Sequence, residues 1–198
     1  MPAAVEIHPA QLPSSARRKL TREDCLALQA AGLLDWEHYE LIDGELIKKM
    51  PKSRLHTLTL LRLVAWLQDV FGRWHVEHEA VIGLSPALDP TNEPEPDAIV
   101  LRRASAEFPD ANPGPADILL VAEISVTTQD YDLGAKAALY ASAGIEEYWV
   151  LDLVQARIVV HRQPTGDHYE SITAYSAAEA VSPLAAESAV LRLRDLLS

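Results

Sequence analysis

The sequence predicts an α/β fold of the α+β kind, in which a central mixed β-sheet is flanked by helices. Three observations predict it: two segments with helical periodicity, several short runs of β-forming residues, and a continuous apolar run over residues 117–125 that is typical of a strand covered on both faces. The 198 residues contain a single cysteine, so we expect one domain, over residues 21–198, without an intrachain disulfide. Residues 1–20 hold three prolines and no periodicity, which indicates a flexible arm.

The N-terminal part of this domain predicts a helix followed by a β-hairpin. Thr21 can cap a short helix over residues 21–32, which Gly32 would end. Residues 39–48 contain two strand-like runs on either side of Asp43-Gly44, the strongest two-residue hairpin signal.

A long helix and two strands are expected next. Ser53 can cap a helix over residues 53–71, in which Leu60, Val64 and Leu67 form one apolar stripe. The β-forming runs that follow predict two strands, bordered by proline-rich loops, at residues 75–85 and 97–101.

The C-terminal part predicts another helix and three strands. Helical periodicity runs over residues 132–144 and ends at Gly144, and a run rich in β-formers follows at 146–152. A C-terminal β-hairpin is expected from the runs at 157–162 and 168–175. The tail is compatible with a strand or a helix because of its closely spaced leucines, Leu191, Leu193, Leu196 and Leu197.

Charge and hydropathy limit the classes of function. The sequence has no apolar signal-peptide region and no run of about 18 apolar residues, so we expect a cytoplasmic protein without a membrane partner. No nucleotide-binding glycine motif occurs, and no organic cofactor is expected. The net charge of −12 argues against nucleic acid. Four basic residues nevertheless fall within seven positions, as a solvated cluster or as phosphate contacts: Lys48, Lys49, Lys52 and Arg54.

Two carboxylates lie at positions where the surrounding sequence pattern predicts apolar strand residues. Glu123 lies inside an apolar run, so it must be paired, protonated or bound to a cation; a structural ion pair is the alternative to a functional role. Asp97 opens a strand directly after a proline, where a solvated aspartate is also common. If the two strands are neighbours, the two carboxylates offer oxygen ligands that suit magnesium.

Lys136 is the third such residue. Together with Leu133, Ala137 and Tyr140 it forms the stripe of its helix that should face the sheet. Either its long side chain reaches water, or its ammonium group lies beside the two carboxylates. In the second case it can orient a water molecule or stabilise the charge that builds on a phosphoryl group.

Weaker candidates surround these three. His56 begins the apolar face of the first long helix, where a hydrogen-bonded core histidine is the alternative to an auxiliary catalytic residue. Glu40 and Glu45 fall on the same face of the predicted hairpin, and Glu45 is a second auxiliary candidate.

An ordered set of short strings in the sequence resembles the pattern of a known family. In order, the matching strings are Tyr39 to Leu46 (YELIDGEL), His56, Pro96-Asp97, Glu123-Ile124-Ser125, Tyr131-Asp132-Leu133 with Lys136 and Tyr140, and Gly144 to Trp149. The chain resembles, over roughly residues 20–198, the Uma-two family of restriction endonucleases within the PD-(D/E)XK nuclease superfamily. Each string is weak alone, but the ordered set is specific.

The resemblance implies a restriction-endonuclease-like α-β-β-β-α-β core and a set of site residues. Asp97, Glu123 and the main-chain carbonyl of Ile124 would hold magnesium, or alternatively manganese. The superfamily lysine usually lies two residues after the glutamate, where this chain has Ser125. The resemblance places the same charge at Lys136, on the neighbouring helix.

The resulting hypothesis is a magnesium-dependent endonuclease that acts on DNA. Asp97, Glu123 and Lys136 would form the catalytic centre, with His56 or Glu45 as auxiliaries, the basic cluster at 48–54 on the DNA backbone, and a homodimer as the assembly. The alternative is a nuclease fold that no longer cuts and serves as a binding or assembly module. A structural protein in which Lys136 pairs with Glu123 without metal is a third possibility.

Overall fold

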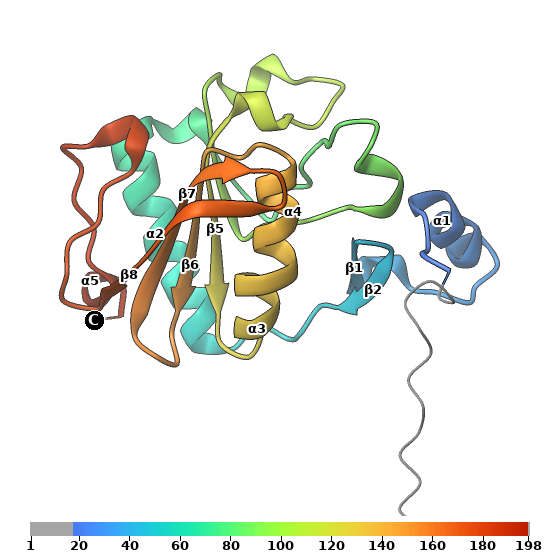
Figure 1. Cartoon of the computed structure of the whole chain (residues 1–198), viewed down its shortest axis with the longest axis horizontal. Helices are drawn as coiled ribbons and strands as arrows, with labels where there is room; N and C mark the ends of the chain where they lie inside the picture. Colours follow the sequence, from blue (N-terminus) through green and yellow to red (C-terminus); the bar gives the residue numbers. More distant parts are fainter. Residues whose placement is uncertain (1–17, 198) are drawn as a thin grey trace, which may run out of the picture.

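The computed structural model describes residues 18–197, so most of the predicted N-terminal arm, residues 1–17, lies outside it. Its centre is a six-stranded sheet with the strands in chain order (Figure 1). Neighbouring strands are antiparallel except β5 and β6, which are parallel, so the predicted mixed sheet is confirmed. The strands are β3 (Val76–His78), β4 (Ala98–Leu101), β5 (Ile118–Ser125), β6 (Glu147–Asp152), β7 (Arg157–Thr165) and β8 (His168–Ser176).

The N-terminal segment forms a separate small unit at one end of the molecule (Figure 1). Helix α1 (Arg22–Ala30) starts with the predicted capping box at Thr21. The hairpin of β1 (Tyr39–Ile42) and β2 (Glu45–Lys48) has the expected register, with Glu40 opposite Ile47. A bridge between Leu41 and Glu93 joins this hairpin to the loop before β4.

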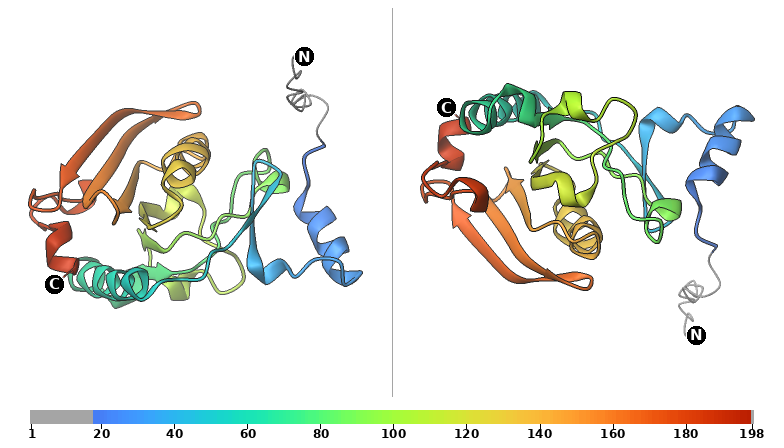
Figure 2. Two further views of the ribbon diagram at one scale, coloured as in Figure 1. Left: turned by 90° about the horizontal axis from the view of Figure 1, so that it is seen from below. Right: turned by 90° about the horizontal axis from the view of Figure 1, so that it is seen from above.

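Helices cover both faces of the large sheet (Figure 2). One face carries α2 (Arg54–Phe71), which contacts β3, β4 and β5, together with α5 (Leu193–Leu197). The other carries α3 (Gln129–Tyr131), a π-helical turn at Asp132–Lys136, and α4 (Ala137–Ser142). Short 3-10 helices occupy connections at Trp36–His38, Arg73–His75, Asp89–Thr91, Ser105–Glu107, Pro115–Asp117 and Leu184–Ala186.

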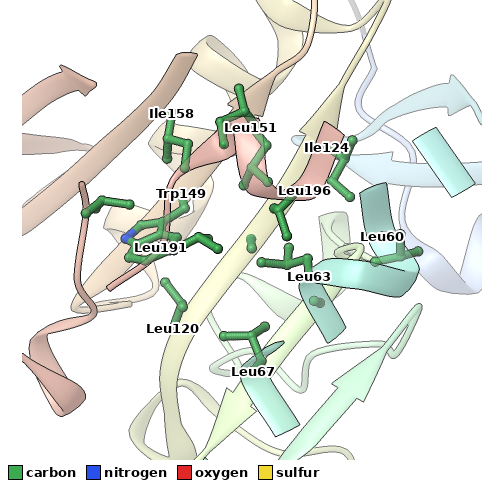
Figure 3. Packing of buried hydrophobic residues seen from close by; sticks show 14 of the residues in the cluster. Leu60, Leu63, Leu67, Leu120, Ile124, Trp149, Leu151, Ile158, Leu191 and Leu196 are labelled. Atoms are coloured by element: carbon green, nitrogen blue, oxygen red, sulfur yellow. The ribbon is translucent and has the colours of Figure 1, made fainter. Parts of the chain in front are cut away.

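Alternation along β5 divides the buried residues between the two faces. Leu120, Ala122 and Ile124 belong to the hydrophobic cluster under α2, whereas Val121 belongs to the cluster under α4. Figure 3 shows the first cluster, in which Leu60, Leu63 and Leu67 of α2 meet strand and C-terminal residues. This alternation directs Glu123 toward α4, on the same face as Val121.

Several expected boundaries were wrong. The strand predicted over 75–85 ends at His78, because Glu79 adopts a φ of +53°, a left-handed conformation that an extended strand cannot continue. The helical segment predicted over 132–144 starts earlier, at Gln129, and the first five residues of the predicted range form the π-helical turn. The C-terminal hairpin is present and longer than predicted. The ambiguous tail contains both forms, a β-bridge at Leu191 and then helix α5.

Two leucines of α2 test how far the core depends on this helix. Leu63 is fully buried, so Leu63→Ala removes packed methyl groups and should lower the free energy of unfolding by about 2–5 kcal/mol in urea titrations. Leu61, two residues earlier on the same helix, is 60% exposed, and Leu61→Ala should change stability by less than about 0.5 kcal/mol. Equal losses for the two variants would contradict the packing described here.

Candidate active site

Antiparallel pairing of β4 and β5 brings the two expected carboxylates together. Ala98 pairs with Ala122, and Asp97 and Glu123 each lie one residue beyond this pair. The amide of Ile124 donates to Asp97 Oδ2 at 2.8 Å, and the amide of Asp97 approaches Glu123 Oε2 at 3.4 Å. Both side chains are buried, so their charges must be balanced by nearby groups.

Lys136 supplies that balance for Glu123. Its Nζ lies 2.8 Å from Glu123 Oε1 and 3.0 Å from Glu40 Oε2, and the residue is 5% exposed. The lysine therefore does not extend to water but holds two carboxylates from different parts of the fold. The Tyr140 hydroxyl, one turn further along the helix, donates to Glu123 Oε1 at 3.0 Å.

His56 contacts the other carboxylate from the opposite side. The Ser53 hydroxyl caps α2 by accepting from the His56 amide at 3.1 Å, which fixes His56 in the first turn. Its Nε2 lies 3.1 Å from Asp97 Oδ2, while its Nδ1 is buried and has no hydrogen-bond partner among the residues that the structure describes.

All of these side chains except Tyr140 line one cavity of about 180 Å³. Lys48, Lys49 and Lys52 also line it, whereas Arg54 and Glu45 do not. Glu45 is exposed at the far end of the hairpin, opposite Ile42. All predicted site residues except these two therefore lie around the cavity. The cavity is also lined by residues 126–128 and by Glu40, Glu95, Tyr131 and Asp132.

Burial and neighbouring charges shift the protonation of the central groups. Burial raises the pKa of the Glu123 carboxyl to about 8, although the Lys136 ammonium lowers it. Burial would lower the pKa of Lys136, but Glu123 and Glu40 outweigh it and the pKa lies well above its usual value. Lys136 is therefore a permanent cation at neutral pH.

Asp97 behaves in the opposite way to Glu123. Burial would raise its pKa, but the hydrogen bond and charge of His56, the charge of Lys52 and the bond from the Ile124 amide together hold it below its usual value. The two carboxyls thus differ in character: Asp97 is the stable anion of the site.

Three site residues were missed or given little weight by the sequence reasoning. Glu40 shares a face of the hairpin with Ile42 and Ile47, which favours burial, although Glu45 on the same face is exposed. Asp132 and Tyr140 lie four residues before and after Lys136, the spacing at which helical side chains share a face. Asp132 is buried and accepts a hydrogen bond from Thr128 at 2.5 Å.

Two features are absent from residues 18–197, the part of the chain that the structure describes. No group of three or more histidine, cysteine, aspartate and glutamate side chains is arranged to hold a metal ion. No helix there has the length and apolar character needed to cross a bilayer.

The raised pKa of Glu123 predicts a pH-dependent stability. Between the unfolded value of about 4.3 and the folded value of about 8, the folded chain binds an extra proton, so stability falls as the pH rises. Glu123→Gln cannot titrate and should lose this component, which amounts to at most about 1.4 kcal/mol per pH unit. Urea unfolding between about pH 5 and pH 8.5 without divalent cations would measure it. Glu45→Gln, an exposed control, should keep the wild-type slope; parallel curves for wild type and Glu123→Gln would contradict the assignment.

Comparison with known proteins agrees with the fold and the sequence resemblance. A solved structure from Anabaena variabilis, described as "a putative nuclease belonging to DUF820", superposes with a TM-score of 0.62 at 17% identity, covering 85% of this chain and 94% of that one. No curated protein matches the sequence. The sequence profile of Uma2, described as "Putative restriction endonuclease", matches residues 22–194. The chain therefore belongs to the Uma2 family of restriction-endonuclease-like proteins.

Proposed function

We propose that this protein is a metal-dependent endonuclease that hydrolyses phosphodiester bonds in DNA. The observation that carries the proposal is the meeting of Asp97, Glu123 and the buried ammonium of Lys136 in one cavity. The family to which the chain belongs and the nuclease fold it shares support the same chemistry.

The donor atoms around the cavity fit a hard divalent cation. Oδ2 of Asp97 is engaged by the Ile124 amide and His56, which leaves Oδ1 with Lys52 as its partner. Oε2 of Glu123 has a long contact to a main-chain amide. One oxygen from each carboxylate, with the proposed carbonyl of Ile124 and several waters, suits magnesium, and manganese accepts the same ligands.

A bound magnesium ion would lower the pKa of a coordinated water and reduce the charge on the scissile phosphate. Lys136 stays protonated, so we assign it the stabilisation of negative charge in the transition state rather than proton abstraction. Tyr140 and Lys136 together fix Glu123 Oε1, which leaves Oε2 directed toward Asp97. His56 positions Asp97 from the side of α2.

The basic cluster is proposed to contact the DNA backbone. Lys48, Lys49 and Lys52 line the cavity, and Arg54 stands exposed in the first turn of α2. Lys49 is paired with Glu95 at 2.6 Å, so local ion pairs offset part of this positive charge. Two copies of the site would cleave both strands of a duplex in one encounter, and we propose a homodimer as the active form. No role is proposed for Glu45, since it lies outside the cavity.

A plasmid-cleavage assay with magnesium tests the proposal. The wild-type protein should convert supercoiled DNA to nicked or linear forms, and chelation of the metal should stop the reaction. Asp97→Asn, Glu123→Gln and Lys136→Met should each reduce the rate by at least roughly 10²-fold, because each removes a ligand or the charge that stabilises the transition state. Glu45→Gln is the matched acidic control and should cleave at the wild-type rate.

The result that would overturn the assignment is cleavage by Asp97→Asn or Lys136→Met as fast as by the wild type. A second outcome would also contradict the proposal of an active nuclease: the wild type binds magnesium and Glu123→Ala does not, yet the wild type cuts no nucleic acid. The net charge of −12 supports the alternative, which is a binding module that does not cut nucleic acid. Such a module would show no magnesium-dependent stabilisation that Glu123→Ala removes.

A further inference from the structure

Asp97 has three side-chain and main-chain partners, and they differ in how easily they can leave. The Ile124 amide belongs to β5 and is fixed by the sheet. His56 is buried in the first turn of α2. Lys52 lies 3.2 Å from Oδ1, and its side chain is 39% exposed. Lys52 is thus the partner that can exchange without disturbing an element of the fold.

The surroundings of Lys52 include a second carboxylate with which its ammonium group can pair. It lies between β2 and α2 in a stretch without regular secondary structure. Its ammonium also pairs with Glu79, whose left-handed backbone ends β3 beside the cavity. Glu79 is 42% exposed, so it can keep the ammonium at the cavity mouth after the contact with Asp97 is broken.

We propose that Lys52 holds the coordination position on Asp97 Oδ1 that a divalent cation takes, and that the cation must displace it. The inference rests on the proposed function, because it takes Asp97 as a metal ligand. In the metal-free protein the ammonium compensates a buried carboxylate. On metal binding it moves fully to Glu79, which keeps the ammonium near the site without a contact to the metal ligand.

Two consequences follow from this competition. Removal of Lys52 leaves Asp97 with less compensation, so the metal-free protein should become less stable. The same change removes the competitor, so the affinity for the cation should increase. A lysine with a purely structural role would produce the first effect without the second.

The experiment measures magnesium binding rather than activity. Thermal unfolding midpoints are recorded against magnesium chloride concentration and converted to affinities by linkage. Lys52→Gln should lower the midpoint without metal and bind magnesium roughly three- to tenfold more tightly than the wild type. Lys52→Arg retains a cation on Asp97 and should stay near the wild type. Lys49→Gln is the matched control, since Lys49 lines the same cavity but pairs with Glu95; its magnesium affinity should be unchanged.

Equal or weaker magnesium binding by Lys52→Gln would overturn the inference, as would an equal gain in Lys49→Gln. Asp97→Asn separates this failure from that of the proposed function. If the wild-type midpoint shift persists in Asp97→Asn, the metal site itself is misplaced and both proposals fail. If the shift disappears in Asp97→Asn but is the same in Lys52→Gln and the wild type, only the competition is wrong. The absence of a shift in every variant overturns both.

Discussion

The structure depends on one buried ammonium group held between two carboxylates. Lys136 joins Glu40 of the N-terminal hairpin to Glu123 in the middle of the sheet, so a single cation connects the small unit, the sheet and the helical layer. Removing any member of such a group leaves an uncompensated charge among largely buried side chains, at a cost of several kcal/mol. The same group of charges therefore shapes the site and, with the bridge from Leu41 to Glu93, attaches the hairpin to the rest of the fold.

Most of the elements could be predicted from local patterns, and the central residues could be predicted because they break those patterns. Glu123 in an apolar strand and Lys136 in an apolar helical stripe each require a partner, and the sequence alone indicates this. The pairing of β4 with β5 could not be derived from the residues alone, since it is a property of strand order. The contribution of Glu40, 96 residues from Lys136, is non-local in the same way.

Boundaries failed where a single backbone conformation decided them. Glu79 terminates β3 by a positive φ that nothing in its residue type requires, although this conformation aims its side chain at Lys52. The π-helical turn at 132–136 lacks a residue signature, yet it lies where Asp132 and Lys136 both reach the cavity. Such turns are frequent at functional sites, and here the irregularity and the site coincide.

The connection between the two parallel strands bears on where in the chain the lysine of this site can lie. A crossover from β5 to β6 has to begin at the end of β5 and pass over one face of the sheet. The first turns of the crossover therefore lie over the last residues of β5, and this follows from the strand order and not from the sequence of the turns. Ser125 lies two residues after Glu123 on the same face of β5, and its hydroxyl is 3.3 Å from Thr128 at the start of the crossover. A lysine at either position would therefore be directed toward the same side of the sheet as Glu123.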